Sequence, residues 1–583
     1  MSHSKPVRKT LTMLMSVTLA GSLLLAGCSS GNSNGEAAGP GNNGSAKPDV
    51  VTENPAAFKF DPPVTVHAAT RYQQQSETDF KPGESVEDNQ HLRWMKEKLG
   101  IDVKFDFIVP TLEDYTTKMR LLLSGGSPLP DTFIATVDLA TDMINAGKAM
   151  PLNELMDKYN SPQLKELYEN YPEVLYPVTR EGKIYGIPNM FAMDEGSVMW
   201  IREDWLQAAG KEAPKTIDEL GEVLKAFTEN DPDQNGKNDT FGMAVSLKDS
   251  PFSWMSSADP IAGAYSDYMP SLTSITEYWV EDENGELAYS AIRPEQKDFL
   301  AKLADWNKNG YIDPEAGIKD PAKAAEMAAS GKAGVIFGPY WMDGYPLKEV
   351  KGFKAYPLPS GPDGQVGRAE KPLVHDYTMI SKDFDHPEAV LGYINKLFSL
   401  NFGESDPYFS DDFKNGYHEG YDYVVHDGKV VRNNYDAAGV PQDKWPNPND
   451  PTVSYGPFFP FNEAPLVPYL GDGAFQKFEE NPDAEPANLM EASTKALTER
   501  QLSAGLVRVS QNDSAILNKF NGAPTATMQS KGELLLKLAR ESYLKIIMGA
   551  EPVDYFDTFV EQWKKNGGDQ VTKEVNDWYK SVQ

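Results

Sequence analysis

The sequence contains a single cysteine, Cys28, and this limits how the chain can be stabilised. One cysteine cannot close a disulfide within the chain. If the Cys28 thiol is covalently modified, the chain also has no thiol nucleophile and no cysteine ligand for a metal. The chain of 583 residues must therefore be held together by packing, and 40% hydrophobic and 11% aromatic residues are enough to build large cores.

The segment before Cys28 has the charge and hydropathy order of a secretory signal. Lys5, Arg8 and Lys9 precede an apolar run over 11–26, and no acidic residue interrupts them. The run is too short to span a bilayer comfortably. We therefore expect this segment to direct export.

The tetrad at 25–28, Leu-Ala-Gly-Cys, resembles a bacterial lipobox. The resemblance implies that 1–27 is a lipoprotein signal peptide and that the Cys28 thiol receives a diacylglyceryl group. We expect a protein anchored by lipid on the extracellular face of a cell membrane, of the Gram-positive type. The alternative is an ordinary signal peptide followed by an incidental buried cysteine.

The residues after Cys28 are predicted to form a flexible tether over 28–57. Its segments 29–35 and 39–45 have almost no apolar content, so they cannot bury enough surface to offset chain entropy. The remaining 58–583 is long for one domain and suits two lobes. No apolar run in it approaches the ~20 residues of a membrane-spanning helix.

The formal net charge of −31 bounds the partners of the protein. Such acidity argues against binding to nucleic acid and against adhesion to anionic lipid surfaces. It argues only weakly against an anionic ligand, because a local basic pocket can override the overall charge.

Hydrophobic periodicity indicates strands that alternate with helices. The predicted strands are 64–70, 101–107, 131–135, 197–202 and 334–337, and 182–188 is predicted as a hairpin-like turn into a strand. The predicted helices are 88–100, 112–124, 215–229 and 531–549, and the third begins with a capping box of Thr216 and Glu219. The alternation predicts an α/β fold with mainly parallel sheets. Trp94, Trp200 and Trp205 lie within these elements and are assigned to the core, and Arg202 and Asp204 could form a structural ion pair.

Several motifs occur in an order that is recognisable as a set. They are Asp131-Thr-Phe-Ile after a Ser-Gly-Gly-Ser-Pro turn, Gly182-Lys-Ile-Tyr-Gly-Ile-Pro188, Trp200-Ile-Arg-Glu-Asp-Trp-Leu206 before Pro214-Lys-Thr216, Gly331-Lys-Ala-Gly-Val-Ile-Phe-Gly-Pro-Tyr-Trp341 and Tyr543-Leu-Lys-Ile-Ile-Met-Gly-Ala550. Their order resembles family 1 of the extracellular solute-binding proteins of bacterial ABC importers, which includes maltose-binding proteins. The closer likeness is to large oligosaccharide-binding lipoproteins of the LplA/YtcQ type and to alginate-binding proteins.

The resemblance implies a periplasmic-binding-protein type II fold, with two α/β lobes, hinge crossings and a ligand cleft between the lobes. It places the first lobe at about 58–188 plus part of 372–480. The second lobe takes about 189–371 plus part of the C-terminal helical region. Candidate hinges lie near Pro188–Asn189 and between Pro357 and Tyr377. The implied partners are an oligosaccharide and the subunits of a membrane permease, and we expect a monomer.

An acidic loop follows the predicted helix 215–229. Asp231, Asp233, Asn235 and Asp239 place oxygen side chains at alternate positions with Gly236 at the sixth, and Lys237 offers its carbonyl. Ca²⁺ takes six to eight oxygens at ~2.3–2.6 Å, and this spacing can wrap them around one ion. We expect a structural calcium site whose sixth ligand is open, because Thr240 stands where the alginate-binding relatives carry an acid. The alternative is a solvated turn.

A sugar offers hydroxyls to polar side chains and apolar C–H faces to aromatic rings. The resemblance places Tyr340 and Trp341, after Gly338-Pro339, first among the ligand-binding candidates, followed by Phe252 and Trp254. Further candidates sit at strand ends or on a predicted cleft rim: Asp376, Tyr377, Arg71, Tyr72, Trp445 and Tyr455. Since the chain has 63 aromatic residues, the competing interpretation of each ring is ordinary core packing.

Two rival classes remain open besides capture of a carbohydrate for transport. One is a lipid-anchored enzyme that acts on polysaccharides, since the 86 acidic residues could hold a catalytic pair. No Gly-x-Ser-x-Gly, His-Glu-x-x-His or phosphate-binding glycine loop supports it, and we expect no enzyme. The other is a surface receptor or adhesin on the same fold. Within binding proteins, a peptide or another small solute is the alternative ligand.

Overall fold

The computed structural model describes residues 49–50, 54–72, 80–190, 196–370, 373–461 and 465–582. The predicted signal peptide, the predicted lipidation site Cys28 and most of the predicted tether lie outside these residues. In the part of the chain that is described, no helix has the length and apolar content to cross a membrane.

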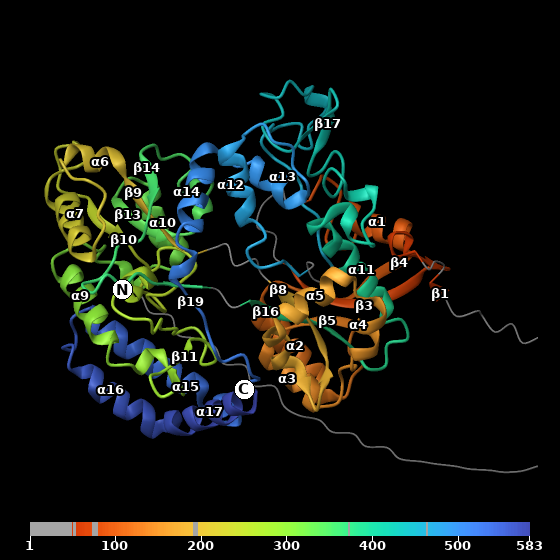
Figure 1. Cartoon of the computed structure of the whole chain (residues 1–583), viewed down its shortest axis with the longest axis horizontal. Coiled ribbons are helices and arrows are strands. Elements are labelled where there is room, and N and C mark those ends of the chain that lie inside the picture. Colours follow the sequence, from red (N-terminus) through yellow and green to blue (C-terminus); the bar gives the residue numbers. More distant parts are fainter. Residues whose placement is uncertain are drawn as a thin grey trace, which may run out of the picture. The chain divides into compact units, whose positions relative to one another are not determined.

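A five-stranded sheet in the order β4-β3-β5-β16-β8 forms the centre of the first lobe (Figure 1). Its strands are β3 (Val64–Arg71), β4 (Ile101–Val109), β5 (Thr132–Ala135), β8 (Gly186–Met190) and β16 (Val374–Ile380). In β3 the even positions face the core and Thr65 and His67 face out, so the apolar alternation of the sequence fixes which side is buried.

A four-stranded sheet in the order β10-β13-β9-β14 forms the centre of the second lobe. Its strands are β9 (Val198–Arg202), β10 (Phe241–Ala244), β13 (Ala333–Gly338) and β14 (Phe353–Tyr356). Every residue of β13 is buried, as expected for a central strand covered on both faces. Trp200 and Trp205 are buried here and Trp94 in the first lobe, which confirms their assignment to the core.

Helices cover both sheets. Those of the first lobe are α1 (Gln90–Trp94), α2 (Leu112–Gly125), α3 (Val137–Asn145), α4 (Asn153–Tyr159), α5 (Pro162–Asn170) and α11 (Glu388–Phe398). Those of the second lobe are α6 (Glu203–Ala208), α7 (Ile217–Glu229), α8 (Asp259–Gly263), α9 (Gln296–Lys308), α10 (Pro321–Ala329), α14 (Glu499–Val509), α15 (Ala526–Ile547), α16 (Tyr555–Trp563) and α17 (Asp569–Val582). The predicted capping box of Thr216 and Glu219 is confirmed at the start of α7.

The predicted helix 88–100 ends at Gly100 for two reasons. After α1 the chain widens into a π-helix over Met95–Leu99, and Gly100 then takes a left-handed φ of 65°. A Cβ at Gly100 would also lie 2.2 Å from the carbonyl oxygen of Phe60. Only glycine satisfies both the turn and this close approach.

The expectation of mainly parallel sheets was wrong, because both sheets are mixed. In the first lobe β3 runs parallel to β4 and β5, but β16 runs antiparallel to both β5 and β8. In the second lobe β10 and β13 are parallel and β9 runs antiparallel to them, while β14, which pairs antiparallel with β9, runs in the same direction as β10 and β13. A strand that arrives from the other lobe enters at the edge where the parallel strands end, so it must run in the opposite direction.

A third segment lies between α11 and α14 at the top of Figure 1. It contains the hairpin β17 (Val424–His426) and β18 (Lys429–Val431), and then α12 (Asp472–Glu480) and α13 (Leu489–Lys495). The hairpin has a small core of its own, made by Val424, Tyr435 and Val440. We call residues 399–461 the insertion.

Folded structure begins earlier than the predicted end of the tether at residue 57. The short strand β1 (Asp49–Val50) pairs with β2 (Phe60–Asp61). Pro55–Ala57 forms a 3-10 turn, and the Lys396 ammonium donates to the Ala56 carbonyl over 2.8 Å. The chain is therefore joined to the first lobe before residue 58.

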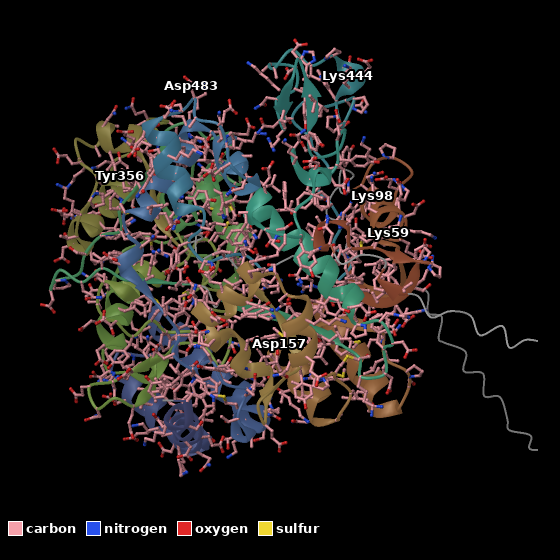
Figure 2. The ribbon with its side chains drawn as sticks, turned by 45° about the vertical axis from the view of Figure 1, so that its right-hand side comes forward. Lys59, Lys98, Asp157, Tyr356, Lys444 and Asp483 are labelled. Atoms are coloured by element: carbon pink, nitrogen blue, oxygen red, sulfur yellow. The ribbon has the colours of Figure 1, made fainter. Side chains whose placement is uncertain are left out.

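Most charged side chains of the described residues lie on the outside. Figure 2 shows Lys59, Lys98, Asp157 and Asp483 pointing outward, and each is exposed. The predicted pair of Arg202 and Asp204 forms with a 2.5 Å contact between Nη2 and Oδ2.

A buried histidine pair joins the insertion to the first lobe. His91 Nδ1 lies 3.0 Å from His418 Nε2, and His91 Nε2 lies 2.8 Å from the Tyr393 hydroxyl. Burial lowers the pKa of His418 to about 4, with a smaller contribution from Arg93, and burial also lowers the pKa of His91. Both rings are therefore neutral in the folded protein at neutral pH.

The pair predicts a loss of stability in mild acid. Because the folded-state pKa of His418 lies below the unfolded value of ~6.5, its contribution is complete above pH 6.5 and is lost as pH falls toward 4, by about 3 kcal/mol. Urea unfolding at pH 7, 6 and 5 measures this change. His418→Gln should flatten the slope relative to the wild type, and His426→Gln should not. An unchanged slope in His418→Gln would contradict the assignment.

Candidate functional site: the cleft between the lobes

The carboxyl ends of β3 and β5 form one edge of the first-lobe sheet. Arg71 ends β3, and Ala135 ends β5 opposite Tyr377. Because β16 runs the other way, Asp376 near its start lies at this same edge. Asp376 and Arg71 both act electrostatically on the Tyr115 hydroxyl, so the two predicted residues are brought together. Tyr72 follows Arg71 and packs against Phe80 and Phe458, with ring centroids 5.4 and 6.0 Å away.

The carboxyl ends of β10 and β13 form the corresponding edge of the second-lobe sheet. The loop after β10 carries Trp254, and the turn after β13 carries Tyr340 and Trp341. The Trp254 and Trp341 rings stack with centroids 5.9 Å apart and an angle of 25°. Trp254 keeps 44% of its surface exposed. Parallel pairing of two strands 90 residues apart thus creates an exposed aromatic platform.

Helix α14 supports the aromatic platform of Trp254 and Trp341. Tyr340–Asp343 forms a 3-10 turn, and the buried Asp343 carboxylate accepts hydrogen bonds from the Arg500 guanidinium and from the Thr498 hydroxyl at 2.8 Å. Both donors belong to the start of α14. Tyr340 is half-buried and packs edge-on against Phe475 at 5.2 Å. Helix α14 thus holds the 3-10 turn from one side, and the Trp341 ring remains able to stack on Trp254.

The chain crosses between the sheets where these two edges lie. Seven residues separate β8 from β9, and β9 begins beside Gly338 at the end of β13. The predicted hinge at Pro188–Asn189 falls inside β8, so this crossing begins after Met190. A second crossing leads from β15 (Arg368–Ala369) into β16, and a third passes Leu466, whose amide donates to the Met190 carbonyl over 2.9 Å.

A buried ion pair ties the crossings together. Arg368 Nη1 donates to Glu370 Oε2 over 2.7 Å, and both side chains are inaccessible to solvent. The guanidinium fills the space beside Gly196, where an added Cβ would lie 1.6 Å from Nη1. Asp259 accepts from the Ala369 amide at 3.0 Å and from the Ser197 hydroxyl at 3.4 Å. Burial raises the pKa of Asp259, and Arg368 opposes the shift.

A cavity of about 210 Å³ lies between the lobes. The first lobe lines it with Asp138 at the start of α3, with Glu173, and with His375 of β16. The second lobe contributes Ser274, Thr276, Glu277, Asn518, Phe520, Asn521, Gly522 and Pro524. Asp138 is close enough to Glu533 on α15 for their charges to interact, and burial raises the pKa of Asp138. Sequence patterns did not indicate Asp138, Glu173 or Glu277, because each belongs to an ordinary helix start or loop.

Four of the predicted ligand-binding side chains are used in internal packing. Phe252 is buried and contacts the Phe299 and Tyr543 rings at 5.5 and 6.3 Å. Tyr377 is 1% exposed and donates its hydroxyl to the Val174 carbonyl. Tyr455 is also buried, and Trp445 packs on the core of the insertion, where its indole N–H donates to Val440. Their faces are therefore taken by protein.

The predicted calcium loop brings its donors into mutual contact. Asn235 lies between two acids, with its side-chain nitrogen 2.7 Å from Asp233 Oδ2 and 3.1 Å from Asp239 Oδ1. The Asp231 carboxylate accepts the amides of Asn235 and Gly236. Lys332 reaches Asp239 Oδ2 over 2.6 Å and lowers the pKa of Asp239.

The donor chemistry of this loop fits Ca²⁺, although one donor is engaged by a cation. The oxygen types and their order are those calcium takes. Thr240 is buried with its hydroxyl on the Phe227 carbonyl, so it adds no ligand. As the side chains stand, no three His, Cys, Asp or Glu residues of the described segments are grouped closely enough to hold a metal.

The family assignment rests on residues 78–399, more than half of the chain, which match the bacterial extracellular solute-binding proteins. The chain belongs to this family. The match spans β4, β5, β8 and β16 of the first-lobe sheet, the whole second-lobe sheet and two of the three crossings, so the two lobes and the cleft between them are the solute-binding fold.

Two curated relatives from Bacillus subtilis (strain 168) cover most of the chain. The polygalacturonan/rhamnogalacturonan-binding protein YtcQ is 26% identical over 412 residues, which are 70% of this chain and 72% of YtcQ. Lipoprotein LipO is 25% identical over 517 residues, 84% of this chain and 88% of LipO. The fold is also that of an EF-hand mutant of FusA, an ABC-transporter substrate-binding protein of Streptococcus pneumoniae, in complex with fructo-nystose. That structure has a TM-score of 0.62 and 18% identity and covers 89% of this chain and 99% of FusA.

Proposed function

We propose that this member of the family captures an oligosaccharide in the cleft and delivers it to the permease of an ABC importer. The observation that carries the proposal is the pairing of an exposed tryptophan platform on one edge with polar groups on the other. Trp254 and Trp341 offer a flat apolar face, and Arg71 and Asp376 offer hydrogen bonds to hydroxyls.

The carbohydrate class is supported by the relatives. YtcQ is named for polygalacturonan and rhamnogalacturonan, and FusA was solved with fructo-nystose. These sugars differ in charge and in ring size, but all are oligomers with alternating hydroxyl and C–H faces. The residues that we assign to the ligand are Trp341, Trp254, Tyr340, Arg71, Tyr72 and Asp376.

The ligand acts by stabilising a closed arrangement of the lobes. Groups on both edges contact the sugar together only when the edges approach, so the sugar binds the closed state more tightly and shifts the population toward it. The permease then recognises the closed state. The buried residues at the crossings limit the motion to a few backbone positions.

We also propose that the loop 231–239 holds a structural Ca²⁺. Asp231, Asp233, Asn235 and Asp239 would bind it through side-chain oxygens and Lys237 through its carbonyl, with water completing the shell. The ion would compete with Lys332 for Asp239. Its chemistry here is electrostatic, since it neutralises three carboxylates on one short loop.

The anchor belongs to the same proposal. A diacylglyceryl group on Cys28 would hold the protein on the extracellular face of the membrane beside its permease, and relative LipO is named a lipoprotein. Each buried CH₂ contributes roughly 0.8 kcal/mol of anchoring. We expect the protein to act as a monomer.

Binding of an oligosaccharide is tested by a thermal-shift screen of the purified protein, with monosaccharides and peptides as controls. A ligand at a hundredfold excess over its Kd should stabilise the protein by about 2.7 kcal/mol. Trp341→Ala should weaken the affinity about tenfold by removing one stacking ring, with little change in Tm. Phe252→Ala, in the core, should instead cost about 3–5 kcal/mol of stability. A shift with peptides alone, or cleavage of the sugar on overnight incubation, would contradict the proposal.

Calcium is tested by melting the protein with EDTA and then with added Ca²⁺. We expect EDTA to lower the Tm and Ca²⁺ to restore it, because the carboxylates repel one another without the ion. Asp231→Asn should abolish the response, and Glu229→Gln at the end of α7 should keep it. A Tm that is indifferent to both reagents would make the loop a plain turn.

The anchor is tested in an expressing bacterium by fractionation. Cys28→Ala should move the protein from the membrane fraction to the soluble fraction or the medium, since the acyl chains are lost. Mass spectrometry of the N-terminal peptide should find the lipid on Cys28 of the wild type. Membrane retention of Cys28→Ala would exclude this anchor.

A further inference from the structure

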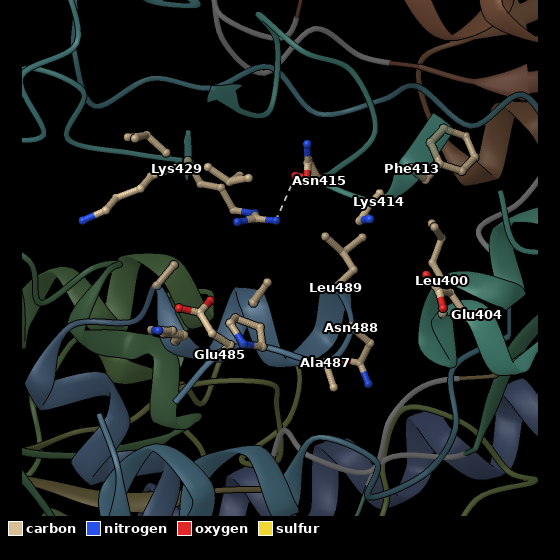
Figure 3. A pocket seen from close by; sticks show the side chains of 18 of the residues that line it. Leu400, Glu404, Phe413, Lys414, Asn415, Lys429, Glu485, Ala487, Asn488 and Leu489 are labelled. Carbon is tan, nitrogen blue, oxygen red and sulfur yellow. Dashed lines mark hydrogen bonds between the residues drawn. The ribbon is translucent and has the colours of Figure 1, made fainter. Parts of the chain in front are cut away.

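A second and larger cavity lies away from the residues that line the space between the lobes. Its volume is about 1,060 Å³, at the upper end of ligand pockets, and its lining shares no described residue with the inter-lobe cavity. Figure 3 shows two walls, one from the insertion with Lys429 and Asn415 and one from 485–489. We call this space the insertion pocket.

Cations from the insertion line one wall. Lys414, Lys429 and Arg432 all border the pocket, and Lys495 of α13 borders it from the other side. In the described part of the chain, none of the four has a carboxylate within ion-pair distance, although many other basic residues do. The lining also holds three carboxylates, Glu404, Asp483 and Glu485, so its cations exceed its acids by one, whereas the whole chain has a net charge of −31.

Arg432 is the most constrained of these cations. Its Nη2 donates to the Asn415 carbonyl over 2.9 Å, shown by the dashed line in Figure 3. Its Nε is buried, and no described group accepts its proton. Burial lowers the pKa of Arg432, and Asp422 opposes the shift. A half-buried guanidinium without a carboxylate gains strongly from an anion that supplies both charge and acceptors.

The opposite wall offers groups of another kind. Glu485 lines the pocket with a carboxylate and Leu489 with an apolar side chain (Figure 3). Asn488 also lines it, and its Oδ1 caps α13 by accepting from the Glu491 amide at 2.9 Å. Lys495 is fixed by its bond to the Ala484 carbonyl, at 2.7 Å. Carboxylate and amide oxygens accept hydrogen bonds from hydroxyls, and an apolar side chain packs on the C–H face of a sugar ring.

We propose that the insertion pocket binds a uronic-acid unit, with the sugar carboxylate at Arg432, its hydroxyls at Glu485 and Asn488, and Lys429 as a further cation of the same lining. The proposal rests on the function proposed above and specifies its ligand: the oligosaccharide, or one of those the protein binds, carries carboxylates. The two walls favour a ligand that carries both a charge and hydroxyls. A bare inorganic anion would be repelled by the Glu485 carboxylate, and a neutral sugar would give the Arg432 guanidinium no anionic partner.

Isothermal titration of the full-length protein with tri-galacturonate, and with the same trimer as its methyl ester, tests the pocket. Arg432→Gln should weaken binding of the acid at least about tenfold, the value of one charge-assisted hydrogen bond, Lys429→Gln should weaken it by a smaller factor, and both should leave binding of the ester unchanged. Lys444→Gln is the matched control, because Lys444 is an exposed cation of the insertion outside the pocket (Figure 2). Lys429 is exposed, so its variant tests the pocket even if Arg432→Gln folds poorly.

The outcomes separate this inference from the function on which it rests. Binding of the acid that survives Trp341→Ala and is lost in Arg432→Gln or Lys429→Gln supports the pocket. Loss in Trp341→Ala with no change in either pocket variant overturns the pocket and keeps the function. Equal weakening by Lys444→Gln, or binding of neutral oligosaccharides but not of the acid, also overturns it. Failure of every oligosaccharide to bind overturns both.

Discussion

The buried contact between Arg368 and Glu370 is the interaction on which the arrangement of the two lobes depends. It fixes the second crossing, fills the space beside Gly196 on the first, and lies within electrostatic range of Tyr469 on the third. A buried pair of this kind adds little net stability, but removing one partner costs about 3–5 kcal/mol because the other charge is left unpaired. The pair therefore acts by fixing one geometry where three chain segments meet.

Most of the fold was predictable from the sequence because each lobe is built from local patterns. The alternation in 64–70 and the capping box at Thr216 act over a few residues, and the structure has both. The direction of β16 and β9 was not predictable in this way. It depends on where a strand enters from the other lobe, and no window of sequence contains that information.

The candidate site was only partly predictable, and Phe252 and Trp254 show why. The two rings stand two residues apart in one loop, yet one enters the core and the other is exposed. The motif that suggested both fixes residue type and position along the chain, but burial depends on α9 and α15, which lie far away in sequence. The cations of the insertion pocket were even harder to predict from the sequence, because single basic residues spread over 414–495 form no motif.

The short pairing of β1 with β2, and the Lys396 bond to Ala56, give the two lobes different mechanical roles. A force applied to the chain at residue 49 enters the first lobe, and within the described residues it passes along the chain to the second lobe through the crossings. A pull on the N-terminal end is thus borne by the first-lobe sheet. If the protein is held at that end, the first lobe is the stationary part, and opening and closing become a swing of the second lobe.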